Sequence, residues 1–120
     1  MQSRRPDNQA ALSHLPLTPA ILYILLAVAD EERHGYGIMQ EVARLTEGAV
    51  QMGPGTLYGT IKRMVAAGLL EEADERPDPA IDDERRRYYR ATRLGLRVLK
   101  AEVSRLRTLV SAARAKKVTP

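Results

Sequence analysis

Apolar residues recur at helical spacing in three stretches of the first half of the chain. Thr18 and Pro19 are residue types favoured at the cap and first position of a helix, and apolar residues follow almost without interruption to Ala29. This first helix should therefore lie at the centre of the core. A second helix is predicted from about Tyr36 to Leu45 and a third between Pro54 and Gly68, each with one apolar face.

The hydrophobic period then changes to that of short strands. Leu69–Glu72 and Arg87–Ala91 are predicted strands, and Ala73–Arg86 between them is rich in Asp, Glu and Pro. Two antiparallel strands with a long polar tip make a wing. The element order predicts a mainly α (α+β) fold with a disordered tail at 1–13, a winged helix-turn-helix domain at 14–91 and a long last helix at 92–117.

The last helix should begin after Thr92, a favourable cap, and it carries a narrow apolar row. Members of the row are spaced alternately by three and four residues, which is the heptad pattern of a coiled coil. We assign the row to a partner helix in a homodimer, with packing against the helix's own domain as the alternative. The predicted dimer residues are Leu96, Leu99, Val103, Leu106 and Val110.

Composition excludes several classes of protein. The 120 residues suit one domain, and the absence of cysteine excludes disulfide scaffolds, thiolate zinc sites and cysteine nucleophiles, so a reducing cytoplasm is the expected location. The longest apolar run, Ala20–Ala29, has ten residues, whereas spanning a bilayer takes roughly 20. The basic last helix has Leu and Val at coiled-coil spacing and no Trp or Phe anchor, so membrane association is not expected either. Neither histidine has a suitably spaced nucleophile and acid, which argues against an enzyme. His34 and the acids at 30–32 resemble a solvated helix end more than a metal site, and no metal or cofactor is expected.

Charge is distributed unevenly along the chain. Residues 30–84 carry 13 acids and 5 bases, whereas residues 85–117 carry 12 bases and 1 acid, a net charge of +11 for the last segment. Such asymmetry is typical of a polyanion-binding surface, and a solvated basic helix explains it equally well.

The third helix has the composition of a helix that enters the major groove of DNA. It carries the cations Lys62 and Arg63 and no acid, inside an otherwise acidic stretch, so nothing on it would repel phosphate. Small residues along it permit a close backbone approach, and Thr56 and Tyr58 can donate to phosphates or base edges. An ordinary amphipathic helix with a polar outer face is the alternative interpretation.

The predicted second wing strand adds a further cationic group. Arg86 and Arg87 lead into Tyr88 and Tyr89, so that cations and aromatic rings alternate between the two faces of a strand and can clamp phosphates. One of the two tyrosines must face the core, and the pattern leaves open which. A charged edge strand that prevents aggregation is the alternative.

Four stretches of the chain together resemble the PadR family of bacterial transcription regulators. They are LTPAILYILL, HGYGIMQEV, GPGTLYGTIKRMVAAGLL and RRRYYRATRLG, in the family's order and spacing. The resemblance implies a dimeric winged helix-turn-helix repressor, in the short-tailed branch that dimerises through one C-terminal helix. It also implies release from DNA by a small hydrophobic ligand.

Residue roles are carried over from the same resemblance by position. Tyr36 and Tyr58 resemble phosphate-contacting residues, and Thr56 and Lys62 resemble recognition-helix contacts. Arg87 and Tyr89 resemble contacts at the base of the wing. The resemblance implies double-stranded DNA, a second copy of the chain and a small hydrophobic effector as partners.

The sequence departs from the family pattern at two places. Gly59 stands where the family commonly has proline, which makes the start of the third helix more flexible. The wing tip at 75–84 is acidic and should not enter a minor groove, so only the arginine-rich base of the wing is expected to meet DNA.

Two further expectations concern function. The effector pocket should lie at the dimer interface, between the first and last helices, where Tyr23 could stack on a ligand although a core role suits it better. The runner-up function is a winged-helix protein-interaction module without specific DNA binding, which would not need the acid-free third helix or the arginines before Tyr88.

Overall fold

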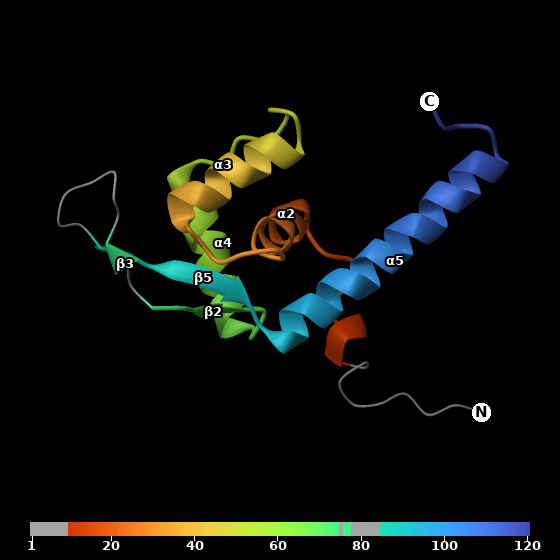
Figure 1. The fold of residues 1–120 in the computed structure, drawn as a ribbon. Helices are drawn as coiled ribbons and strands as arrows, with labels where there is room; N and C mark the ends of the chain where they lie inside the picture. Colours follow the sequence, from red (N-terminus) through yellow and green to blue (C-terminus); the bar gives the residue numbers. More distant parts are fainter. Residues whose placement is uncertain (1–9, 75, 78–84) are drawn as a thin grey trace.

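The computed structural model describes residues 10–74, 76–77 and 85–120, and in this part of the chain the helices pack beside a small antiparallel sheet at one edge of the molecule (Figure 1). The sheet has the strand order β1-β5-β2, and a second strand pair, β3-β4, forms the stem of the wing. This arrangement confirms the predicted winged helix-turn-helix with a long last helix. The elements are α2 (Pro19–Ala27), β1 (Arg33–His34), α3 (Gly35–Leu45), α4 (Pro54–Ala66), β2 (Leu70–Glu72), β3 (Arg76–Pro77), β4 (Arg85–Arg86), β5 (Tyr88–Ala91) and α5 (Arg93–Ala115).

Side-chain caps explain where three of the helices begin. The hydroxyl oxygen of Thr18 accepts a hydrogen bond from the Ile21 amide at 3.4 Å, which confirms the predicted start of α2. Thr92 caps α5 in the same way and also donates to the Gly68 carbonyl, so it fixes the helix to the end of α4. His34 caps α3, a role that its position in the sequence does not reveal.

Helix α2 forms the centre of the core, as its uninterrupted apolar sequence predicts. It lies between α3 and α4 on one side and α5 on the other (Figure 1). Burial of these side chains is the main source of stability. The fully buried apolar residues come from every helix and include Ile24, Leu25, Ile38, Val42, Leu57 and Val98.

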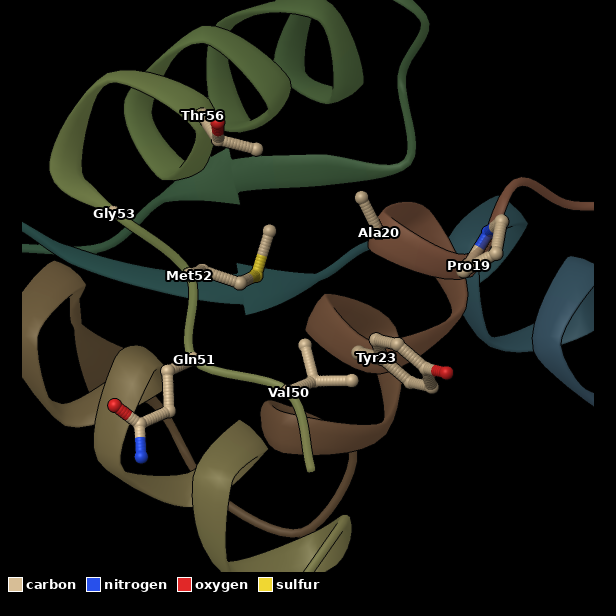
Figure 2. Close-up of a pocket in the computed structure, with 8 residues that line it drawn as sticks. All are labelled: Pro19, Ala20, Tyr23, Val50, Gln51, Met52, Gly53 and Thr56. Carbon is tan, nitrogen blue, oxygen red and sulfur yellow. The ribbon is translucent and has the colours of Figure 1, made fainter. Parts of the chain in front are cut away.

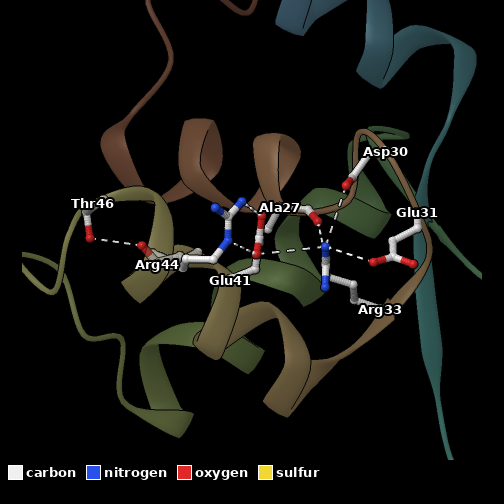
Figure 3. A network of polar contacts seen from close by, with 8 residues as sticks. Ala27, Asp30, Glu31, Arg33, Glu41, Arg44 and Thr46 are labelled. Atoms are coloured by element: carbon white, nitrogen blue, oxygen red, sulfur yellow. Dashed lines mark hydrogen bonds and ion pairs between the residues drawn. The ribbon is translucent and has the colours of Figure 1, made fainter.

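Strand β1 is an element that the sequence analysis missed. It pairs antiparallel with β5, Arg33 opposite Tyr89 and His34 opposite Tyr88. Arg33 also closes the end of α2, since its Nε donates to the Ala27 carbonyl at 2.6 Å (Figure 3). A two-residue strand has no alternation to detect, and its residues lie next to the polar cluster that ends α2.

Buried Glu41 joins the same network from α3. Its carboxylate accepts from Arg44 at 2.6 and 2.8 Å and lies 3.8 Å from the Arg33 guanidinium (Figure 3). The hydrogen bonds from Arg44 lower the pKa of Glu41 below its ordinary value, although burial opposes them. Arg33 further approaches Glu31 at 3.0 Å, so the acids after α2 are engaged in ion pairs.

The predicted N-terminal tail and the predicted wing lie only partly within the described residues. Most of the tail predicted at 1–13 lies outside the described residues, but residues 10–12 form a helical turn in which Ala11 is buried. The wing stem pairs Arg76 with Arg86 and Pro77 with Arg85. Apart from Arg76 and Pro77 in the stem, the acidic wing tip at 75–84, predicted to swing away from DNA, lies outside the described residues.

Helix α5 is divided between two environments. Its first half packs on the core, whereas its second half extends away from the rest of the molecule (Figure 1). This division corrects the assignment of Leu99 to a dimer seam, because that side chain is only 6% exposed and belongs to the protomer's own core. The other four seam residues remain at least partly accessible: Leu96, Val103 and Val110 are exposed and Leu106 is half-buried.

Glu102 is the one acid in the basic last segment, and it is buried. Its carboxylate accepts from the Leu17 amide at 2.9 Å and from Arg105, thereby joining α5 to the segment before α2. The bonds from Arg105, and then from Leu17, lower the pKa of Glu102 below its ordinary value against the opposing effect of burial.

Acid is therefore expected to weaken the fold through Glu102. Because its folded-state pKa lies below the unfolded value, its contribution is full above that unfolded value and is lost as the pH falls through the folded pKa. We predict that Glu102→Gln lowers the free energy of unfolding by urea at neutral pH and makes it less dependent on pH in the acid range. Glu47→Gln, at an exposed position after α3, is the control; an acid dependence equal to wild type in Glu102→Gln contradicts the assignment.

Candidate nucleic-acid interface

The outer face of α4 carries the predicted recognition residues. Thr56, Tyr58, Lys62 and Arg63 are all exposed, and α4 contains no acid. Arg63 donates to Thr60 at 3.2 Å, which holds its guanidinium along the helix. Gly53, the residue before the helix, provides no side-chain cap, so the amides of the first turn are available to an outside acceptor.

Tyr58 is positioned by its contact with α3. A Cβ atom added to Gly35 would overlap the Tyr58 hydroxyl and ring, so this glycine is what lets the ring lie against the start of α3. Tyr58 remains 50% exposed, and neighbouring Tyr36 is 51% exposed. The contact between α3 and α4 thus brings the two predicted phosphate-contacting tyrosines to the same end of α3, and Gly35 is a positioning residue that the sequence analysis did not single out.

We predict that Gly35→Ala displaces the Tyr58 ring and weakens DNA binding about tenfold, the loss of one hydrogen bond to a charged group. The fold should survive, because the atoms in conflict lie at the end of a side chain that can turn away. Fluorescence anisotropy with DNA measures the effect. Gly37→Ala in the same helix is the control, since its Cβ would make only ordinary contacts; equal affinities for the two variants would refute the role of Gly35.

The base of the wing meets α4 at a shallow hollow of about 320 Å³. Lys62 and Tyr58 line it from α4, and Arg87 lines it from the chain just before β5. The exposed Arg87 guanidinium lies 3.3 Å from Glu72 on β2, so an acid holds it beside Lys62. The structure therefore brings the predicted helix and wing contacts together.

Tyr89 is mostly buried. It is 7% exposed and belongs to the core, yet it lines the hollow together with Lys62 and Arg87, so its contact at the base of the wing stays a prediction. Burial is the main reason that the pKa of its hydroxyl is raised. Tyr88 is half-buried, and its ring packs nearly perpendicular to that of His34, with the ring centroids 5.3 Å apart.

The remaining arginines of the wing differ in their surroundings. Arg90 is bound by two acids, Glu71 at 2.9 Å and Glu32 at 3.2 Å, so it stabilises the sheet. The side chain of Arg86 lies outside the described part of the structure, and its predicted phosphate contact stays a prediction. The acid partners were missed because strand pairing, not sequence proximity, brings them to Arg90.

His34, considered as a metal ligand, uses its Nδ1 to accept from the Gly37 amide at 3.0 Å. Among residues 10–74 and 87–120, no group of three or more metal-ligating side chains is found. No helix in the described part of the chain is long and apolar enough to cross a membrane.

Comparison with known sequences gives a consistent result. A family model described as the transcriptional regulator PadR-like family matches residues 24–101. The transcriptional regulator Rv3488 of Mycobacterium tuberculosis is 40% identical over 74 residues, which cover 62% of this chain and 63% of that protein. The chain thus matches somewhat less than two thirds of the length of this relative.

Solved structures share the fold. A PadR family transcription regulator from Clostridium difficile has a TM-score of 0.67 and 20% identity, covering 82% of this chain and 97% of the other. Bacillus subtilis PadR in complex with operator DNA has a TM-score of 0.63 and 16% identity, covering 73% of this chain and 47% of that one. At these identities the likeness concerns the fold alone.

Proposed function

Since the chain belongs to the PadR-like family of transcriptional regulators, which are not enzymes, we propose that it binds double-stranded DNA sequence-specifically through α4 and the base of the wing. One observation carries the proposal: Tyr58, Lys62 and Arg87 line one exposed surface along an acid-free helix whose first turn has no side-chain cap. Cations and amide donors in this arrangement suit phosphates, and Thr56 at the exposed start of α4 suits base edges.

The proposed assembly is a homodimer. The exposed side chains of Val103 and Val110 lie seven residues apart, Val103 near the middle of α5 and Val110 on the half that leaves the domain, and there they would pack against a second copy. Such a dimer presents two copies of α4 to a pseudo-palindromic operator with half-sites about one helical turn apart. Bound at a promoter, it would act as a repressor by blocking polymerase, and a small hydrophobic effector would release it.

The runner-up is a winged-helix module that binds protein and not specific DNA. Two features favour it: Arg87 and Arg90 are already paired with acids of the same chain, and the apolar row on α5 would suit a different partner helix equally well. An acid-free α4 is the feature that this function does not require.

Fluorescence anisotropy with DNA from upstream of the protein's own gene, beside a scrambled duplex of equal length, distinguishes the two functions. We expect preferential binding to the upstream DNA that weakens steeply with added salt, because phosphate contacts release counterions. Equal binding to both duplexes at every salt concentration would contradict a sequence-specific regulator and favour the protein-interaction module.

A further inference from the structure

A hollow of about 330 Å³ lies between α2 and the segment that leads into α4. On one side it is formed by the first turns of α2, and on the other by residues 50–53 and the first turn of α4 (Figure 2). This is not the place between the first and last helices where the sequence analysis expects an effector. The lining residues are Pro19, Ala20, Tyr23, Val50, Gln51, Met52, Gly53 and Thr56.

The chemistry of the lining indicates its occupant. None of the lining residues is charged, in a chain where 28% of residues are charged. Figure 2 shows the Met52 side chain reaching between Ala20 and Thr56, and the Gln51 amide turned away from them. A charged ligand would lose its hydration here without gaining a partner of opposite charge, so the lining suits a neutral, largely apolar molecule. Ligand pockets commonly measure about 300–1,000 Å³, so the hollow suits a small ligand.

The position of the hollow connects it to the proposed recognition helix. Gly53 is the residue immediately before α4, and Thr56 lies in the first turn. A molecule that contacts both residues would therefore affect the orientation of α4 relative to the segment before it. Met52 adds an unbranched, flexible side chain that can adapt to a ligand's shape.

We propose that this hollow binds a small, neutral, apolar molecule and that its occupation weakens DNA binding by shifting the start of α4. The ligand site is argued from the hollow alone, whereas the effect on DNA rests on the proposed function. For the second part to hold, the molecule must bind one arrangement of α4 better than the other. Coupling of this kind typically changes affinity by about 5-fold or more.

The test uses the full chain with carbon-13 in its methionine methyl groups and indole as the neutral probe. The Met52 methyl signal, assigned with Met52→Leu, is expected to shift and saturate, while core Met64 serves as an internal reference. Ala20→Leu should fill the hollow and abolish the shift, whereas Ala66→Leu, at an exposed helical position, should not. Val50→Met fills the hollow from the opposite wall, and it replaces Ala20→Leu in the test if that variant does not fold.

Several outcomes would overturn the proposal. An unsaturable Met52 shift, or one that persists in both filled variants, would exclude the site. Tighter binding of indole-3-acetate than of indole would overturn the neutral class of ligand. A Met52 signal that changes on dilution without probe would identify a second copy of the chain as the occupant.

DNA binding is measured separately, so that failure of the proposed function is recognised. Indole at saturation is expected to raise the dissociation constant for the upstream duplex in wild type and Ala66→Leu but not in Ala20→Leu. A saturable Met52 shift with unchanged DNA affinity would overturn the coupling. Failure of the wild type to prefer this duplex without indole would instead refute the proposed function, and the methyl titration would still report on the site.

Discussion

Replacing Lys62 with glutamate is expected to weaken operator binding roughly tenfold or more while leaving the fold intact. Lys62 is exposed on the acid-free face of α4 and lines the hollow where that helix meets Arg87. The substitution removes a phosphate contact and places an acid beside the DNA, so attraction is replaced by repulsion. Because each lost contact lowers the salt slope by about 0.9, a dimer should lose about twice that amount.

Anisotropy titrations over a range of salt concentrations measure both the affinity and the slope. Lys116→Glu makes the same charge change at the end of α5, so it controls for the effect of net charge alone. Thermal unfolding should give the same midpoint for wild type and Lys62→Glu. If both variants lose the same affinity, attraction depends on overall charge, and α4 is not the helix in the groove.

The helices were predictable because their signals are local. Thr18 with Pro19, Pro54 and Thr92 mark starts within a residue of those in the structure, and Gly68 follows the end of α4 with a positive φ of 77°. Caps and turns act on the residues beside them, so their type and spacing carry the information.

Contacts between distant segments were less predictable. The alternation around Tyr88 and Tyr89 shows that one ring faces the core, but only pairing of β5 between β1 and β2 identifies it as Tyr89. The acid partners of Arg90 depend on the same pairing. The family resemblance implies a surface role for Tyr89, whereas the structure leaves only 7% of this residue exposed, where it lines the hollow.

Buried Glu102 was missed, although the sequence contains a signal for it. It is the one acid among twelve bases at 85–117. Exposure to solvent does not explain a single acid in such a basic segment. An acid so isolated in sequence requires a specific partner if it is buried, and Arg105 one helical turn later supplies it. Its second partner, the Leu17 amide, lies 85 residues away and could not be inferred.

Heptad spacing likewise cannot distinguish a partner helix from the helix's own domain. Leu99 and Leu106 occupy equivalent positions one heptad apart, yet Leu99 is buried where α5 crosses the core and Leu106 lies farther along the helix, half-buried. The structure distinguishes the two leucines, because it shows the position at which α5 leaves the domain. A helix can therefore use one apolar row for two purposes along its length.

This division predicts opposite results for two charge substitutions on α5. Leu99→Lys should lower the free energy of unfolding by about 3–5 kcal/mol, because it places an unpaired ammonium in the core. Because the total stability of a domain is about 5–15 kcal/mol, this loss should lower the unfolding midpoint markedly, and at the low end of that range it leaves a measurable unfolded fraction, whatever the oligomeric state. Val103→Lys combined with Val110→Lys should instead give folded monomers, because both side chains are exposed in the protomer.

Analytical ultracentrifugation and thermal unfolding of the two variants separate these effects. The double variant should sediment as a monomer with a native circular dichroism spectrum, and its DNA affinity should fall because two linked half-site contacts become independent. Ser104→Lys with Ser111→Lys adds the same charge on exposed positions one residue beyond each valine and is the control. If the double valine variant remains a dimer, the exposed row on α5 is not the homodimer interface, and the second copy must bind elsewhere.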